Sequence, residues 1–488
     1  MLSEFASWGM QEACSPSSSE VGQVRKHLSR SERRALFTGS QHEHLRQYEI
    51  VLQKLETTFP TFTTDKCGSV VRSFFEGRMQ LDKSIFSIEV GVNENVTALF
   101  ENVLTAPCDP GRGGNVPAKR YPRKRQQIFS MLELCLEILH NDKPIVNSVD
   151  KVNHPRNKIH IVEFCSGSGH IGFPLLSLLE REMSDRADSH HGLDAIVLTL
   201  LDMNGVALQR AKKRAEDLGF FETGNGENFR IRHFQNLPSH VKPPVCFEKR
   251  LPGEGASNTR KPVALRVEIL ECMVADYETY FLGETDSFDI GTALHACGKA
   301  SDEVLDVCTR RASKGFVVCP CCVGRLGLGH DNAVFMEQRP VCTETQEQSD
   351  YPKSDGQELA EAMFSPAGNC RSKTREEFLT KWATTAWAKT TQMVYPRSSA
   401  FRELLSFTDY QALAKAADWH EQGGESVRDA GRLRAKSFVE LDRMLCAEEQ
   451  RRAPGAKAAG SPDLPFVTLR KMQFPTSTPK NDVLVGKF

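Results

Sequence analysis

The chain has 488 residues, and 40% of them are apolar, which is enough to bury a core of domain size. Its 62 Lys and Arg residues nearly balance its 63 Asp and Glu residues. The overall charge therefore excludes a strongly basic nucleic-acid-binding chain, and any RNA partner would have to be held by local basic patches. The 15 cysteines are scattered and odd in number, which argues against a small disulfide framework and favours reduced thiols in the cytoplasm or the nucleus.

The N-terminal part shows no recognisable domain. Residues 1–40 are Ser-rich and are predicted to be poorly ordered. The basic segment 21–36 is compatible with an organelle presequence, but Glu20 and Glu32 weaken that interpretation. We expect neither a secretory signal nor a membrane span, because no apolar stretch is long enough. Residues 41–118 are predicted to form a small helical or mixed region that ends in a Pro/Gly-rich linker.

A basic run follows the linker and consists of Lys119, Arg120, Arg123, Lys124 and Arg125. It leads into apolar residues at helical spacing, although positive charge at a helix start is unfavourable for the helix dipole. Two interpretations stay open. The run is either a solvated charged face or a patch that binds RNA phosphates through salt-sensitive contacts.

From residue 158 onward, apolar runs of strand length alternate with helical patterns, which is typical of a parallel α/β sheet. Strands are predicted at residues 159–164, 195–201, 263–274, 288–294, 315–319, 466–472 and 482–485. Helices are predicted at residues 171–182, 205–218 and 301–312 and between 375 and 450, with insertions at about 236–262 and 325–374.

Seven strands that finish with a short pair fit a doubly wound sheet whose last strand is inserted antiparallel. This is the Rossmann-like α/β architecture of class I S-adenosylmethionine (SAM)-dependent methyltransferases. We predict it for residues 119–488, with loop insertions and a helical N-terminal extension.

A Gly-rich turn after the first predicted strand is the strongest local signal. Gly167 and Gly169 lack Cβ, so the backbone can bend tightly and approach a ligand. Glu163 is placed to hold the amino group of a bound methionine moiety. A dinucleotide site competes with this interpretation, because its fingerprint is also a Gly-rich turn between a strand and a helix. We read the run Cys165-x-Gly167-x-Gly169 as the looser methyltransferase loop.

Two further acidic residues follow the second and third predicted strands. Asp202 is expected to accept hydrogen bonds from the ribose hydroxyls, and it or Asn204 could also cap the next helix. Asp276 is expected to accept from the adenine amine or to be an exposed loop residue. The candidate cofactor-binding residues of the three segments are Glu163, Cys165, Gly167, Gly169, His170, Asp202, Met203, Asp276 and Tyr277.

Cysteines mark the ends of the fourth and fifth predicted strands, which should be neighbours in the sheet. The residues that we expect on the acceptor side are His295, Cys297, Cys321 and Cys322. Four interpretations stay open for this region together with Cys319: buried core residues, thiol catalysis on a pyrimidine ring, a zinc site and redox sensing. The Cys-Pro-Cys-Cys spacing is unusual for zinc, and we predict no metal. The fourth strand is not followed by an Asp/Asn-Pro-Pro-aromatic motif, which disfavours methylation of an exocyclic nitrogen.

Five segments resemble a known family: 163–170 (EFCSGSGH), 293–302 (ALHACGKASD), 319–322 (CPCC), 438–443 (FVELDR) and 479–486 (PKNDVLVG). Together they resemble the methyltransferase domain of the glutathione S-transferase C-terminal domain-containing proteins. They are more distantly similar to the eukaryotic tRNA 2′-O-methyltransferases of the thirteen type, which share the His-x-Cys-Gly segment and the paired cysteines. The resemblance covers about residues 124–488 apart from the insertions. It implies SAM as cofactor and, through the distant relatives, RNA and most of all tRNA as substrate.

The sequence therefore predicts a SAM-dependent methyltransferase that acts on RNA. A non-catalytic module that keeps the fold as a scaffold is one alternative, and a protein or small-molecule methyltransferase is another. The sequence predicts neither a general base nor an oligomeric state.

Overall fold

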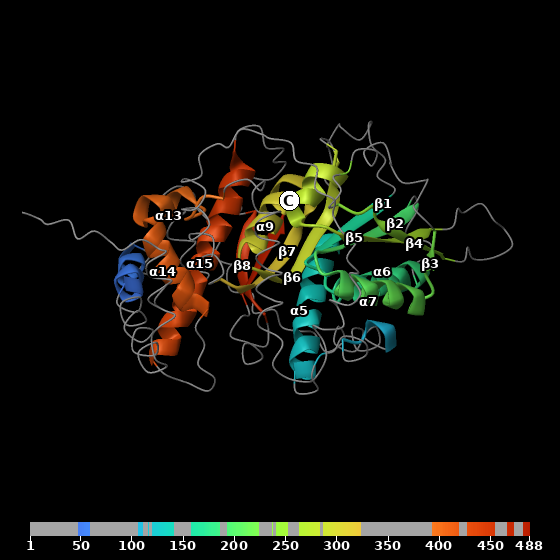
Figure 1. Ribbon diagram of the computed structural model, residues 1–488, viewed down its shortest axis with the longest axis horizontal. Helices are drawn as coiled ribbons and strands as arrows, with labels where there is room; N and C mark the ends of the chain where they lie inside the picture. The colour runs from blue at the N-terminus through green and yellow to red at the C-terminus, as the bar shows by residue number, and fades with distance from the viewer. Residues whose placement is uncertain are drawn as a thin grey trace, which may run out of the picture.

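The apolar runs predicted as strands form one mixed sheet, and in the described part of the chain its nine strands have the order β3-β4-β5-β2-β1-β6-β7-β9-β8 (Figure 1). The computed structural model describes residues 47–58, 106–110, 116, 120–140, 158–185, 193–223, 237, 241–251, 263–283, 286–323, 393–418, 427–453, 466–472 and 482–488. The strands are β1 (Lys158–Phe164), β2 (Ala195–Asp202), β3 (Phe221–Glu222), β4 (Val245–Arg250), β5 (Ala264–Glu271), β6 (Phe288–Cys297), β7 (Ala312–Cys322), β8 (Val467–Lys471) and β9 (Asp482–Lys487).

Seven of these strands have the topology that the sequence predicts. β1 pairs in parallel with β2 and β6, β2 with β5, and β6 with β7. β9 lies antiparallel between β7 and β8. The predicted antiparallel insertion of the last strand is thus confirmed, and the chain has the Rossmann-like fold of class I methyltransferases.

The remaining two strands extend the sheet at the edge beside β5. β4 pairs antiparallel with β5, and β3 pairs antiparallel with β4. β4 lies inside the segment 236–262, which the sequence suggested as an insertion loop. Its Cys246 and Phe247 are buried, so part of that segment belongs to the core.

Helices cover both faces of the sheet (Figure 1). One face packs against α5 (Tyr121–His140), α6 (Gly172–Asp185) and α7 (Gly205–Asp217). The other face packs against α9 (Lys299–Arg311), α14 (Phe407–Asp418) and α15 (Val427–Arg452), together with the helical residues 47–58. The other elements are η2 (Ala106–Cys108), α8 (Val274–Asp276), the π-helical turn η6 (Tyr277–Phe281) and α13 (Ser399–Leu404). Apolar side chains on the two faces of the sheet thus form two separate core clusters.

Several predictions fall outside the described residues. They concern residues 1–40, Lys119 and the insertion at 325–374. None of the described helices is long and apolar enough to cross a membrane.

Candidate cofactor and acceptor site

The turn between β1 and α6 is fastened to the end of β2. The Gly167 amide donates to Asp202 Oδ2 at 2.7 Å. Three turn residues have left-handed φ angles, 50° at Cys165, 56° at Gly167 and 73° at Gly169. This conformation is strained for Cys165, which carries a Cβ. The two glycines adopt such angles readily, whereas Cys165 must be held in place by its neighbours.

The two glycines of this turn have different roles. A Cβ at Gly167 would meet no atom within 4 Å, so the space beside it is open. A Cβ at Gly169 would lie 2.6 Å from the Phe173 ring and 3.0 Å from Leu200. We expected the backbone to approach a ligand at both glycines, whereas the missing Cβ of Gly169 permits close packing of α6 on β2. Only Gly167 leaves space for a ligand.

Glu163 lies under the first turn of α6. Its Oε1 accepts from the Ile171 amide at 3.2 Å and its Oε2 from the Gly172 amide at 2.7 Å. The side chain is 2% exposed, and burial raises its pKa to about 7 against the opposing effect of these amides and of Lys124. Glu163 thus serves as the cap of α6, a role that the sequence analysis did not assign to it.

His170 and Ser166 bring polar atoms without hydrogen-bond partners to the same turn. His170 Nε2 lies 3.2 Å from Ser168 Oγ, while His170 Nδ1 and Ser166 Oγ are buried and have no partner among the described residues. Burial keeps the pKa of His170 well below its usual value, and the charges of Lys124 and Arg214 act in the same direction. A neutral imidazole with an open nitrogen is suited to hydrogen-bond a ligand.

Asp202 ends β2 and interacts with the backbone on both sides. Besides the Gly167 amide, it accepts from the Asn204 amide through Oδ1 at 2.8 Å. Burial raises the pKa of Asp202. The cap of α7 is Asn204, whose side chain accepts from the Ala207 amide at 3.2 Å. Asp202 is therefore not needed as a helix cap. The next residue, Met203, is 46% exposed, which is unusual for a large apolar side chain at a strand end.

The third predicted segment contributes less than expected. Asp276 ends α8 and is half-buried. Tyr277 is 2% exposed, and its ring lies edge-on to Phe164 with centroids 5.8 Å apart. The Tyr277 side chain is part of the core, and contact of this residue with the cofactor stays a prediction.

The turn after β6 lies beside the Gly-rich turn, since β1 and β6 are neighbours. His295 is exposed and has a φ of 72°, and its charge contributes to the lowered pKa of His170. Cys297 is half-buried, and its Sγ lies 2.8 Å from Cys321 Sγ on β7. The structure therefore brings together three of the four residues predicted on the acceptor side.

The other two cysteines of this edge differ. Cys319 is fully buried in the core, which raises the pKa of its thiol to about 12. Cys322 ends β7, and its side chain lies outside the described residues. Among the residues that the structure describes, no three His, Cys, Asp or Glu side chains are placed to hold a metal ion.

The basic run at the start of α5 divides into exposed and buried residues. Arg120 and Arg123 are exposed. Arg125 lies over two aromatic rings of the same helix, at 5.8 and 5.4 Å from their centroids. Lys124 is turned inward, and burial lowers its pKa to about 8 although the charge of Glu163 opposes the shift. Lys124 thus lies near the Gly-rich turn and apart from the exposed arginines. Binding of RNA by the run stays a prediction.

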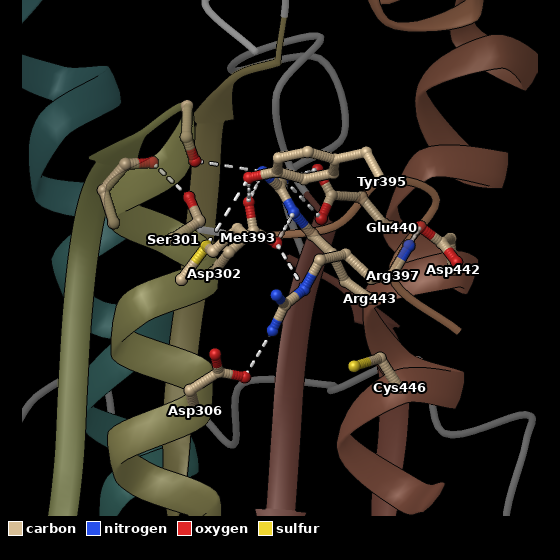
Figure 2. A network of polar contacts seen from close by, with 12 residues as sticks. Ser301, Asp302, Asp306, Met393, Tyr395, Arg397, Glu440, Asp442, Arg443 and Cys446 are labelled. Atoms are coloured by element: carbon tan, nitrogen blue, oxygen red, sulfur yellow. Dashed lines mark hydrogen bonds and ion pairs between the residues drawn. The ribbon is translucent and has the colours of Figure 1, made fainter. Parts of the chain in front are cut away.

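A buried network of ion pairs and hydrogen bonds supports the turn after β6 (Figure 2). Arg443 on α15 is fully buried and donates to both oxygens of Asp302 at 3.0 and 3.1 Å. It also donates to Glu440 at 3.2 Å and to the Gly298 carbonyl at 3.1 Å. Tyr395 donates its hydroxyl to Asp302 at 2.9 Å. Arg443 therefore links α15, α9 and the backbone of the turn that carries His295.

Two neighbouring contacts complete the support. Lys436 on α15 is fully buried and donates to Asp482 of β9 at 2.7 Å. Asp442 accepts from the Ser398 amide and hydroxyl at 2.8 and 2.7 Å. Residues 438–443 and 482–486, which belong to segments that carried part of the family resemblance, are thus structural supports whose role the sequence analysis missed.

Comparison with known proteins agrees with this geometry. Residues 123–327 match a family model described as a methyltransferase domain. The chain contains a methyltransferase domain. The matched residues include the Gly-rich turn, both acidic strand ends and the cysteine-bearing ends of β6 and β7. Such a domain implies SAM as cofactor.

Curated proteins that match the chain are named glutathione S-transferase C-terminal domain-containing proteins. The chain is 25% identical over 377 residues to the glutathione S-transferase C-terminal domain-containing protein homolog of Drosophila melanogaster, which covers 76% of this chain and 38% of that protein. It is 29% identical over 224 residues to the Homo sapiens protein of that name, covering 46% of this chain and 22% of the relative. The chain thus spans well under half the length of these relatives. A solved structure of M. capricolum TrmK in complex with S-adenosylhomocysteine (SAH) aligns with 59% of the chain and 91% of TrmK, at 10% identity and a TM-score of 0.17.

The residues of the methyltransferase domain fit an adenosyl-sulfonium ligand. Open space lies beside Gly167, and unpartnered polar atoms of Ser166 and His170 belong to the same turn. Asp202 ends the neighbouring strand, where an acidic residue can accept from ribose hydroxyls. The exposed Met203 next to it offers an apolar surface for a flat base.

Proposed function

We propose that the chain is a SAM-dependent methyltransferase whose acceptor is RNA, with tRNA as the preferred class. SAM supplies a methyl group on a sulfonium, which is already a good leaving group. The protein's task is then to align the acceptor with that methyl and to exclude competing geometries.

One observation supports SAM over a dinucleotide. In dinucleotide folds the diphosphate binds the open amides at the start of the first helix, where the helix dipole favours an anion. Here the Ile171 and Gly172 amides donate to Glu163, and the Gly167 amide donates to Asp202. Two carboxyl groups therefore occupy the positions that a diphosphate would need. A ligand with a cationic end is compatible with them.

The acceptor side is assigned to the carboxyl end of β6. His295 is exposed there, and Cys297 is half-buried beside it. Cys321 is 7% exposed and faces Cys297, so it is poorly placed to attack a substrate ring. We assign proton acceptance from the substrate to His295, and we assign no covalent role to Cys321.

RNA as acceptor is supported by the resemblance to the tRNA 2′-O-methyltransferases and by the exposed pair Arg120 and Arg123 at the start of α5. Phosphate contacts of this kind position RNA and weaken as salt rises. If they act here, replacing both residues by Gln should reduce the dependence of RNA binding on salt.

A calorimetric titration with SAM and with SAH tests cofactor binding, with Asp202→Asn as the variant and Asp217→Asn, on the exposed side of α7, as the control. The unaltered chain and the control should bind, while Asp202→Asn should bind at least tenfold more weakly, because a hydrogen bond to a charged group contributes roughly 1.5–3 kcal/mol. No heat and no thermal stabilisation with the unaltered chain would leave only the scaffold alternative.

Transfer of a tritiated methyl group into total RNA and total protein tests the acceptor. Label in RNA that is lost in His295→Ala supports the proposal. Label confined to protein or to small molecules refutes RNA as the acceptor. If the chain binds SAM but transfers no label to any of these pools, the proposed RNA methyltransferase activity is refuted and only the cofactor site remains.

A further inference from the structure

The strand ends that carry the acceptor-side residues also bring two thiols into contact. Cys297 ends β6, and Cys321 lies one residue before the end of the neighbouring β7. In the parallel register Cys297 stands opposite Cys322, so Cys321 is adjacent to it across the strand pair. The Sγ atoms of Cys297 and Cys321 are 2.8 Å apart. A disulfide needs them at about 2.05 Å, which a small side-chain rotation on adjacent strands can provide.

We propose that Cys297 and Cys321 are a redox modification site, which closes to a disulfide when the protein meets a peroxide and reopens with a thiol reductant. The inference goes beyond methyl transfer and does not depend on it.

The two thiols differ in accessibility, which sets the order of steps. Cys297 is half-buried next to the exposed His295, whereas Cys321 is 7% exposed. The Cys297 thiolate attacks one peroxide oxygen, the O–O bond breaks, and a sulfenic acid and hydroxide form. The Cys321 thiolate then attacks that sulfur, an S–S bond forms, and the sulfenic oxygen leaves as hydroxide. Two thiols and one hydrogen peroxide thus become one disulfide and two waters, since the thiol protons neutralise both hydroxides.

Closure would tie β6 to β7 at the turn that carries His295. Cys297 Sγ now lies 3.3 Å from the His295 carbonyl, and Cys321 Sγ lies 3.9 Å from the Ala296 carbonyl. Both interactions would be lost when the thiols lose their protons. The left-handed φ of 72° at His295 makes this turn the strained part of β6. The disulfide would therefore act on the acceptor side and leave the Gly-rich turn in place.

The experiment treats the full chain with hydrogen peroxide, blocks remaining thiols with an alkylating reagent and maps tryptic peptides by mass. Cleavage yields peptide 267–299, which holds Cys272 and Cys297, and peptide 315–325, which holds Cys319, Cys321 and Cys322. The expected product is these two peptides linked and two hydrogen atoms lighter than the sum of the two peptides alkylated at Cys272, Cys319 and Cys322 alone, with fragmentation placing the bond between Cys297 and Cys321. Dithiothreitol should return both peptides to the alkylated form.

Three variants make the result specific. Cys321→Ser should abolish the linked peptide and cause Cys297 to accumulate as a sulfenic acid that dimedone traps. Cys297→Ser should abolish both products. Cys446→Ser, at a buried cysteine of α15 that accepts a hydrogen bond from Gln450, should leave the linkage unchanged. Full alkylation of both thiols after peroxide, or a bond from Cys297 to Cys319 or Cys322 in place of Cys321, would overturn the proposal. Because the readout is peptide mass, either outcome leaves the methyltransferase proposal to its own test.

Discussion

Replacing Arg443 by Met is expected to destabilise the fold strongly. The guanidinium is fully buried and contacts Asp302, Glu440 and the Gly298 carbonyl at 3.0–3.3 Å. Burial alone would lower its pKa, but the two carboxylates hold the pKa well above its usual value. Met fills a similar volume and offers no donor. The variant therefore leaves two buried carboxylates without their main cation.

The magnitude follows from what the carboxylates retain. Asp302 would keep the Tyr395 hydroxyl at 2.9 Å and the more distant Arg397 at 3.9 Å. Glu440 would keep Lys436 at 3.5 Å. Breaking a buried ion pair from one side costs roughly 3–5 kcal/mol, and these residual partners place the expected loss in the lower part of that range.

Urea unfolding measures this loss, with Arg310→Met as the matched control. Arg310 also binds a carboxylate with two hydrogen bonds, to Glu278 at 3.1 and 2.7 Å, but its side chain is 49% exposed. An exposed pair contributes about 0–1 kcal/mol. If Arg443→Met unfolds below the measurable range, the triple variant with Asp302→Asn and Glu440→Gln should recover much of the stability. Equal losses for Arg443→Met and Arg310→Met would refute the reasoning.

Four further predictions concern the cofactor and acceptor sides. Gly167→Ala should weaken SAM binding at a stability cost of about 1–2 kcal/mol, set by the left-handed φ of 56°, as titration and urea unfolding can show. Gly169→Ala should cost roughly 1–3 kcal/mol more than that, because its Cβ would lie 2.6 Å from Phe173; an equal cost for the two variants would contradict the packing argument. Burial raises the pKa of Glu163 from 4.5 to about 7. Between pH 4.5 and pH 7 the folded state therefore binds a proton that the unfolded state has lost. The free energy of unfolding should fall as pH rises through this range, by up to about 3 kcal/mol. In Glu163→Gln this component of the slope between pH 5 and 8 should disappear, and parallel slopes for both proteins would exclude the shift. Cys321→Ala should retain methyl transfer, and complete loss with intact SAM affinity would restore a catalytic role for that thiol.

The sheet could be predicted because its signals are local. Each parallel strand buried on both faces is a continuous apolar run, and each is followed by a helical repeat. The order of the strands followed from the rules for α/β connections. The edge strand β4 was missed because Val245–Arg250 lies between Pro- and Gly-rich stretches, and its burial depends on pairing with β5.

The site was predicted in position more than in role. The sequence located Glu163 and Asp202 at strand ends, but it did not show that Glu163 turns to the α6 amides. Lys124 was grouped with its basic neighbours, although its spacing of four residues from Ile128, and of eight from Leu132, puts it on the buried face of α5. That periodicity was the available signal, and it was outweighed by the run of charges.

The buried network around Arg443 connects α15, which is distant in sequence, to the strand end that carries the acceptor-side residues. Arg443 reaches the Gly298 carbonyl directly, and Gly298 has a φ of 58° at the point where β6 gives way to α9. The position of His295 and Cys297 therefore depends on α15, which lies about 145 residues along the chain. A methyl acceptor must be aligned within a fraction of an ångström. We therefore expect the acceptor turn to tolerate changes in exposed residues of α15 and to be displaced by changes at Arg443 or Asp302.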